Sequence, residues 1–232
     1  MKNHRLKRFV LNGGIVLYPT ESCFGIGCDP SNFLSIQKIK LLKKRNIKKN
    51  FLIIGSDVIQ FKKYLQSLNN AQLKELYSKW PGPHTWVVDA KENCVPWLLS
   101  KNKKIAVRIP NFNICQALNQ SINMPIISTS ANVSGKRPIK NYRQACRFAN
   151  SHVKLIKGRI GNQKKPSTIQ DFATKKILRK YHRSDKSGLY QQYLERRQRL
   201  THIFSDHCIK NDRHPATEWS CYALLKNSSL HN

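Results

Sequence analysis

The chain has 232 residues, of which 40% are hydrophobic, so it is long enough for one sizeable core and an extension. No stretch approaches the roughly 18 consecutive apolar residues of a membrane span, which excludes a transmembrane helix and a membrane partner. Seven cysteines occur at irregular spacings without a CxxC pair, which argues against a disulfide framework or a zinc ribbon. Reduced thiols in a cytoplasmic protein fit this pattern best.

The formal net charge is +30, from 42 Lys and Arg against 12 Asp and Glu. Clustered basic side chains neutralise phosphates and release counterions, so such a charge suggests a nucleic-acid partner. Lysine, asparagine and isoleucine are nevertheless abundant along the whole chain, as a genome-wide compositional bias would leave them. Contact with tRNA or another RNA therefore stays an open alternative.

The hydrophobic pattern predicts strands alternating with helices, beginning with a short basic helix at 4–11 that Gly13 and Gly14 end. Further helices are predicted at 31–43, 58–65, 71–80, 115–121 and 142–150. Strands are predicted at 15–18, 51–54, 85–88, 105–109, 125–128 and 153–156. This alternation is typical of an α/β fold with a mixed sheet.

After about residue 183 the alternation stops and the apolar residues show no sustained period. We therefore expect one domain over 1–182 and an unassigned, poorly ordered extension over 183–232. The histidines and cysteines of the extension match none of the compact spacings of zinc ligands, so no metal site is expected there.

Four polar groups are each expected where a strand ends, which is where ligands gather in open α/β sheets. The first is the run 18–22, in which the Thr20 hydroxyl, on a loop stiffened by Pro19, can bond a small substrate. Gly25 and Gly27 follow and let backbone come close. An ordinary glycine-containing turn is the competing interpretation.

The second group is Lys43, Lys44 and Arg45, with Lys48 and Lys49 close behind. Cations at a helix C-terminus are stabilised by the macrodipole, so a solvated helix end is one interpretation. A phosphate clamp is the other, with lysine as a point charge and arginine as a bidentate fork. Composition leaves both open.

The third group is the run 128–135, where short hydroxyls and an amide crowd together, and the fourth is 166–169, followed by Asp171 and Arg179. Many donors with little bulk suit an anionic or polar ligand, although a Ser/Asn-rich turn would look similar.

Together these motifs have the order and spacing of the threonylcarbamoyl-AMP synthases, and the chain resembles the short, single-domain bacterial form of that family over about residues 4–182. The motifs are Tyr18-Pro19-Thr20-Glu21, Lys43-x-Arg45, Trp80-Pro81-Gly82-Pro83, Ala106-Val107-Arg108, Ser128-Thr129-Ser130-Ala131-Asn132 and Pro166-Ser167-Thr168-Ile169. The chain departs from the family pattern at Asn46 and Asn50, and at Cys23 and His84, where apolar residues are commoner.

The resemblance implies a YrdC-like α/β fold, a twisted mixed β-sheet with flanking helices around a basic concave cleft. It implies that L-threonine is bound by Thr20, Arg108 and Ser130. It implies that ATP is bound by Lys43, Arg45, Lys49, Ser130, Asn132, Ser167 and Arg179. No enzyme nucleophile and no protein-held metal are expected.

The activity implied is that of a nucleotidyltransferase. The threonine amine takes up bicarbonate, and the carbamate attacks the α-phosphorus of ATP, so that L-threonylcarbamoyladenylate forms and pyrophosphate leaves. The product would serve N6-threonylcarbamoyladenosine formation at position 37 of tRNAs that read ANN codons, with the tRNA threonylcarbamoyl-transfer enzymes as downstream partners. Mg²⁺ would come with ATP, held by substrate oxygens and water.

Two alternatives stay open beside this activity. The first is a non-catalytic RNA-binding protein that uses the basic cleft. The second is a related domain that accepts carbamoyl phosphate in metal-centre maturation, against which the lack of accessory zinc-finger or acylphosphatase-like segments argues.

Overall fold

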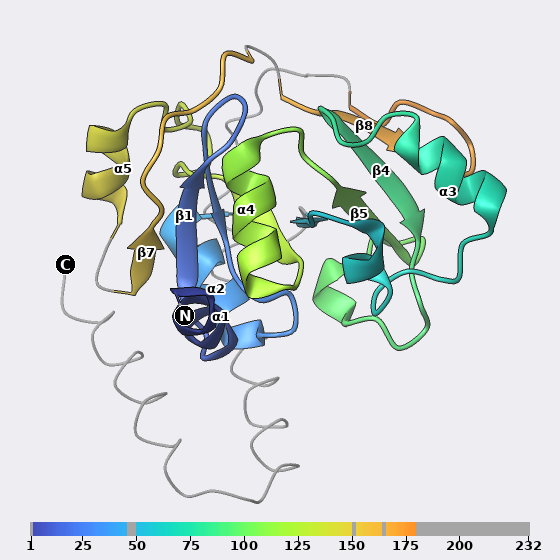
Figure 1. The fold of residues 1–232 in the computed structure, drawn as a ribbon, viewed down its shortest axis with the longest axis horizontal. Helices are drawn as coiled ribbons and strands as arrows, with labels where there is room; N and C mark the ends of the chain where they lie inside the picture. Colours follow the sequence, from blue (N-terminus) through green and yellow to red (C-terminus); the bar gives the residue numbers. More distant parts are fainter. Residues whose placement is uncertain (1, 46–49, 150–151, 164–165, 180–232) are drawn as a thin grey trace, which may run out of the picture. The chain divides into compact units, whose positions relative to one another are not determined.

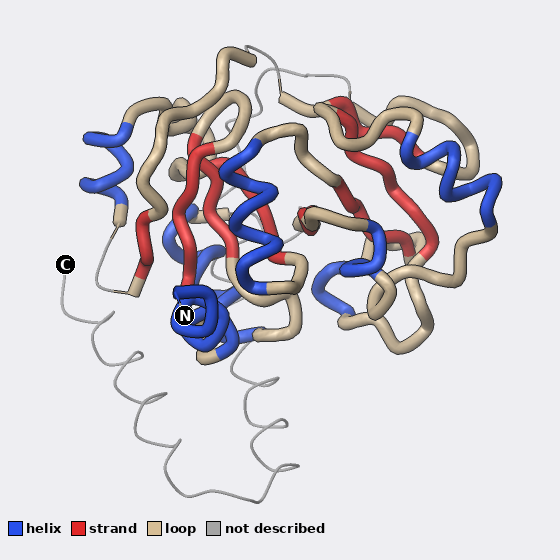
Figure 2. Tube along the Cα trace, in the orientation of Figure 1, coloured by secondary structure: helices blue, strands red, loops and turns tan. Residues whose placement is uncertain are grey.

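An eight-stranded sheet with helices on its faces is formed by the residues that the structure, a computed structural model, describes: 2–45, 50–149, 152–163 and 166–179 (Figures 1 and 2). The strand order is β7-β1-β2-β6-β3-β5-β4-β8. The strands are β1 (Ile15–Pro19), β2 (Phe24–Gly27), β3 (Leu52–Ile54), β4 (His84–Asp89), β5 (Lys104–Arg108), β6 (Ile126–Ser130), β7 (Val153–Leu155) and β8 (Thr168–Asp171). The helices are α1 (Lys2–Leu11), α2 (Phe33–Lys43), α3 (Asn70–Tyr77), α4 (Asn113–Ile122) and α5 (Tyr142–Phe148), with 3₁₀ turns η1 (Val58–Phe61) and η2 (Pro96–Leu98).

The sheet is mixed, as the sequence predicts. Strand β1 runs parallel to β7, β3 to β5 and β4 to β8, while the other neighbouring pairs are antiparallel. The expected extension over 183–232 lies outside the described residues. No helix in the described part of the chain is both long and apolar enough to cross a membrane.

Asparagine side chains begin three of the helices. Asn32, Asn69 and Asn141 each accept a hydrogen bond from a backbone N–H in the first turn of α2, α3 and α5. Each such cap contributes about 1 kcal/mol to helix stability, because it satisfies a donor that the helix itself leaves unpaired.

Strand β6 joins two halves of the sheet by changing partners along its length. Its first three residues, 126–128, pair with β3, and its last two, Thr129 and Ser130, pair with β2. The two partners lie on opposite sides of β6, and the pairing with β3 stops at Ser128. The backbone beyond Ser128 is free of β3, and polar side chains follow on it.

Residues 24–27 form strand β2, so the interpretation of this glycine-containing run as a turn was wrong. Glycine is unfavourable in a strand unless another backbone approaches closely. A Cβ on Gly27 would lie 2.0 Å from the carbonyl oxygen of Ile127 in β6, and one on Gly25 would lie 3.1 Å from the Tyr18 ring in β1. The two glycines thus let β2 fit between its neighbours.

Two other predicted elements also differ. The helix predicted at 58–65 is a single 3₁₀ turn, because Leu65 pairs with Ala90 and the chain must leave the helix to reach it. The polar group predicted at 166–169, where a strand was expected to end, instead leads into a strand, β8, at the edge of the sheet.

Both faces of β1 are buried. Ile15 and Leu17 face a core that includes Ile36 of α2, whereas Val16 and Tyr18 face a second core that α1 and α4 complete. Figure 1 shows α1 and α4 on one side of β1 and α2 on the other.

The centre of the sheet is open on one face. Leu52 pairs with Ala106 and with Ser128, which puts these three side chains side by side on one face, and each is partly exposed. On the other face Ile53 and Val107 are fully buried. Ser130 lies two residues beyond Ser128, and Arg108 two beyond Ala106, so both follow this face, in opposite directions because β5 and β6 are antiparallel to one another.

A substitution at Gly27 tests the close approach of β2 and β6. We expect Gly27→Ala to lower the free energy of unfolding by about 3 kcal/mol, because the methyl group must displace backbone. Gly135→Ala is the control: Gly135 has φ 82° and a Cβ added to it would meet no atom within 4 Å, so about 1 kcal/mol of backbone strain is expected. Equal losses in urea unfolding would contradict the packing explanation.

Candidate active site

Lys43, the last residue of α2, is buried with 2% of its surface exposed. Its ammonium donates to the backbone carbonyl of Ser130, to the backbone carbonyl of Asn132 at 2.8 Å and to the Asn132 Oδ1 at 3.1 Å. The Ser134 N–H returns a bond to the Lys43 carbonyl at 2.7 Å. These hydrogen bonds therefore hold the end of α2 against the loop after β6.

The surroundings of Lys43 shift its protonation. Burial, and then the nearby Arg45 charge, lower the pKa of Lys43 to about 8. All three ammonium protons have protein acceptors, so a direct bond to a phosphate would require one of them to be exchanged. The charge itself is available to an anion bound nearby.

Arg45 lies in the gap that opens where β6 leaves β3. Its Nη2 donates to the Asn50 carbonyl at 2.9 Å, its Nη1 lies 3.4 Å from the Thr129 hydroxyl, and the guanidinium stacks 4.6 Å from the Phe51 ring centroid. Burial lowers the pKa of Arg45 to about 10. Its Nε is buried and has no hydrogen-bond partner among the described residues, so this cation has a donor to spare.

Ser130 and Asn132 form one hydrogen-bonded unit. The Ser130 hydroxyl donates to Asn132 Oδ1 at 2.7 Å, and the Asn132 amide donates to the carbonyls of Val133 and Lys136. The amide orientation is thereby fixed. The unit follows directly from the end of β6, as the sequence predicts, although Ser128–Ser130 belong to the strand itself.

Thr20 lies in the turn between β1 and β2, which its own side chain closes. The Thr20 hydroxyl donates to the Cys23 carbonyl at 2.7 Å, so the oxygen remains able to accept a bond from a ligand. A Cβ on Gly25 would lie 3.1 Å from Thr20 Cγ2, and Gly25 pairs with Ser130, so Thr20 lies near the Ser130 end of β6. Burial raises the pKa of Cys23, and hydrogen bonds with Ser22 and Thr20 partly offset this rise.

Arg108 reaches the same turn from β5. Its Nη2 donates to the Glu21 carboxylate at 2.5 Å and its Nε to the Gly82 carbonyl at 3.0 Å. The turn at 20–23 therefore has Lys43 and its partners near one end and Arg108 at the other. Of the predicted site residues, these contacts bring Thr20 and Arg108 to one turn.

Ser167 and Arg179 lie together at the start of β8. The Ser167 hydroxyl is 3.0 Å from that of Thr85, and Arg179 Nη1 donates to the Ser167 carbonyl at 3.1 Å. Since Trp86 pairs with Val107, Thr85 and Arg108 are neighbours at the end of β4 and β5. Ser167 is thus brought toward Arg108 through Thr85, without a bond between them in the described part of the chain.

The loop after Arg45 contains Lys49 and the departures from the family pattern at Asn46 and Asn50. Lys49 and Asn46 lie outside the described residues, so the role expected for Lys49 stays a prediction. Asn50 is exposed, and its backbone carbonyl holds Arg45.

Glu21 is not among the binding residues predicted from the sequence. Its carboxylate is ion-paired with Arg108, and both side chains are largely buried. The available signal was compositional: Glu21 is an acid in a motif of otherwise apolar and hydroxyl residues, in a chain with 12 acids among 232 residues.

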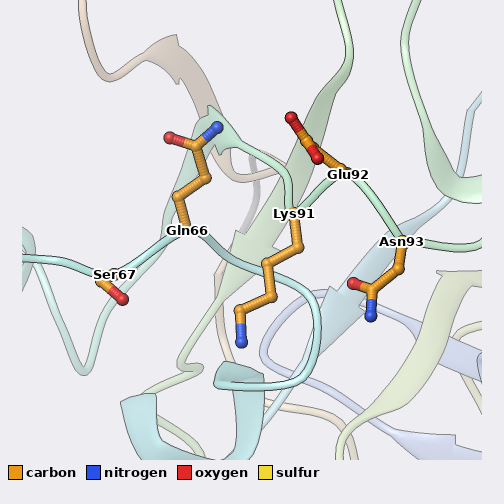
Figure 3. A pocket seen from close by; sticks show the side chains of 5 residues that line it. All are labelled: Gln66, Ser67, Lys91, Glu92 and Asn93. Carbon is orange, nitrogen blue, oxygen red and sulfur yellow. The ribbon is translucent and has the colours of Figure 1, made fainter.

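A hollow of about 500 Å³ lies away from these residues. It is lined by Gln66, Ser67, Lys91, Glu92 and Asn93 (Figure 3). None of the predicted site residues lines it, so we do not place the site there.

The chemical character of the site follows from what it holds. Within the described ranges no three His, Cys, Asp or Glu side chains gather as a metal site, and the five described cysteines are free thiols. Cations, hydroxyls and an amide meet at the open face of the sheet instead. The fold and the site define an α/β protein that binds small anionic ligands by positioning them.

Comparison with known proteins then identifies the family. The model of the Sua5–YciO–YrdC family, described as telomere recombination, matches residues 8–180, and the chain belongs to this family. The threonylcarbamoyl-AMP synthase of Methylobacillus flagellatus is 37% identical over 179 residues, which cover 77% of this chain and 99% of the relative. That of Thiobacillus denitrificans is 38% identical, covering 75% and 93%. The resemblance inferred from the motifs is confirmed.

Solved structures agree on the fold. YciO of E. coli is 25% identical with a TM-score of 0.65, covering 77% of this chain and 87% of its own. Sua5 of P. abyssi, solved in complex with L-threonine, is 24% identical with a TM-score of 0.66, and this chain spans half of it. The expected YrdC-like α/β fold is thereby confirmed.

The lowered pKa of Lys43 predicts a pH dependence of stability. The pKa is about 8 in the fold and 10.5 when unperturbed, so between these values the unfolded chain binds more protons and the Lys43 contribution to stability rises with pH. Between pH 7.5 and 10.5, we expect the free energy of unfolding of wild type to rise by on the order of 2 kcal/mol relative to that of Lys43→Met. The measurement is urea unfolding of both proteins, in which the other titrating groups cancel. A difference that does not change with pH would show that the ammonium is not shifted.

Proposed function

We propose that this chain is a threonylcarbamoyl-AMP synthase, a nucleotidyltransferase that forms L-threonylcarbamoyladenylate and pyrophosphate from L-threonine, bicarbonate and ATP. The observation that carries the proposal is the near-complete coverage of curated relatives of that name. The bonds that hold Thr20 and Arg108 at the turn at 20–23, and the bond between Lys43 and Asn132, support it. The catalytic domain would end near residue 182, with 183–232 as an extension.

Arg108 and Thr20 would bind threonine. The Arg108 Nη1 makes no hydrogen bond within the described residues and is suited to the α-carboxylate, while the Thr20 oxygen can accept a bond from the ammonium or hydroxyl. Ser130 would complete this side of the site.

Arg45, Asn132 and Ser130 would bind ATP, with Lys49, Ser167 and Arg179 closing the nucleotide side. The unpartnered Nε of Arg45 supports a bond to a phosphate oxygen, since a buried donor without a partner is costly. Because the Lys43 protons already have acceptors, Lys43 would act mainly through its charge and by fixing Asn132.

The reaction needs no enzyme nucleophile. The neutral threonine amine adds to bicarbonate with loss of water, and an oxygen of the carbamate attacks the α-phosphorus as the bond to pyrophosphate breaks. Holding the reactants together supplies up to roughly 7–11 kcal/mol, and the fixed cations stabilise the charge that develops on the phosphates.

A Mg²⁺ ion would accompany the triphosphate. The acid in the turn at 20–23, Glu21, is already paired with Arg108. Phosphate oxygens and water would be its ligands. We place the enzyme in the cytoplasm, where tRNA and the downstream threonylcarbamoyl-transfer enzymes would use its product.

A pyrophosphate-release assay with all three substrates tests the proposal. We expect release when threonine, bicarbonate and ATP are present together, and background release when any one is omitted. Equal release without threonine would contradict the substrate assignment. A protein that releases none, yet binds RNA in a salt-dependent way that ATP and threonine do not affect, would favour the RNA-binding alternative.

The phosphate role of Arg45 is tested by Arg45→Ala against Lys62→Ala, an exposed lysine of η1's C-terminal end. We expect Arg45→Ala to lower kcat/KM for ATP by about 100-fold, the loss of one fixed and partly buried charge, and Lys62→Ala to change it less than about two-fold. Similar effects of both changes would show that the basic cluster is only a solvated helix end.

A further inference from the structure

The ion pair between Glu21 and Arg108 connects the two halves of the sheet. Glu21 follows β1 in one half and Arg108 ends β5 in the other, and the Oε1–Nη2 distance is 2.5 Å. The two side chains are 11% and 13% exposed, whereas in the pair of Glu75 with Lys175 they are 39% and 49% exposed. The buried pair is therefore shielded from water and salt to a degree that the exposed one is not.

The backbone of Glu21 is held independently of its side chain. Its carbonyl accepts the Gln163 N–H at 3.0 Å, and the Gly161 N–H donates to the Thr20 carbonyl at 2.9 Å. Gly161 packs so closely that a Cβ there would lie 2.7 Å from the Glu21 carbonyl oxygen. The carboxylate is thus presented from a fixed point.

Two of the three guanidinium nitrogens of Arg108 are thereby occupied. Glu21 takes Nη2 and the Gly82 carbonyl takes Nε, which fixes the plane of the group because both bonds lie in it. The remaining Nη1 is directed by the other two. A ligand that binds Nη1 meets an arginine that has already lost its rotational freedom, which raises affinity.

We propose that Glu21 is a positioning residue for threonine recognition: it acts through Arg108, and it orients the guanidinium toward the α-carboxylate without touching the substrate. The proposal rests on the proposed function. The carboxylate also carries a negative charge, which opposes binding of a substrate carboxylate. Removing the Glu21 carboxylate would lower threonine affinity through lost orientation of Arg108 and raise it through lost repulsion. The loss of orientation outweighs the loss of repulsion, because Arg108 already neutralises the Glu21 charge.

The test is a double-mutant cycle on the full chain, with KM for threonine and for ATP measured by pyrophosphate release. We expect Glu21→Ala to raise the threonine KM about 30-fold and to leave the ATP KM within about two-fold, because Arg108 loses its orientation. Glu21→Gln, which keeps an acceptor for Nη2, should stay within about five-fold of wild type. In an Arg108→Gln background, Glu21→Ala should raise the threonine KM by less than about two-fold further.

Glu75→Ala is the matched control, since it removes an acid from an ion pair away from the turn. Threonine binding by calorimetry without ATP gives a readout independent of turnover, and thermal unfolding shows whether each variant folds. An unchanged threonine KM in Glu21→Ala, or an undiminished effect in the Arg108→Gln background, overturns the positioning role. A wild type without three-substrate activity would overturn the proposed function instead.

Discussion

The structure depends on one strand, β6, pairing with two partners in succession, and on the contact between Gly27 and the Ile127 carbonyl that permits it. Since β3 pairs only with residues 126–128 of β6, a gap between β3 and β6 begins beside Thr129. Arg45 occupies that separation, and the loop after β6 turns toward the end of α2. The cations and the Ser130–Asn132 unit are therefore neighbours because of how one strand is shared.

The cations of the site are stabilised mainly by neutral groups. Lys43 is held by carbonyl and amide oxygens, and Arg45 by a carbonyl, a hydroxyl and an aromatic ring. Only Arg108, among these three, is paired with an acid in the described part of the chain. Neutral acceptors leave the positive charge uncompensated, so the site attracts anions while its side chains stay fixed. The same burial lowers the pKa of both Lys43 and Arg45.

Much of the fold was predictable because β-branched runs and helical spacing are local signals. Strand β1 and helix α2 appear close to where the sequence places them, whereas β2 and β8 were missed because glycine and polar residues hide a strand that tertiary contacts impose. The site residues were proposed from motifs, and among them the structure brings Lys43, Ser130 and Asn132 into hydrogen-bond contact. The burial of Lys43 and the partner of Glu21 were not, since they depend on residues 87 to 89 positions away in the chain.

Strands β7 and β8, the last two in the described residues, occupy the opposite edges of the sheet, and the segment between them passes the turn at 20–23. A chain emerging from the ribosome would present β1 and β4 with unpaired edges until these strands are made. The contacts of Gly161 and Gln163 with the turn arise in the same interval. Synthesis of β7, β8 and the segment between them would therefore complete both the edges of the sheet and the backbone contacts around the turn at 20–23. A chain that ended before β7 would lack both.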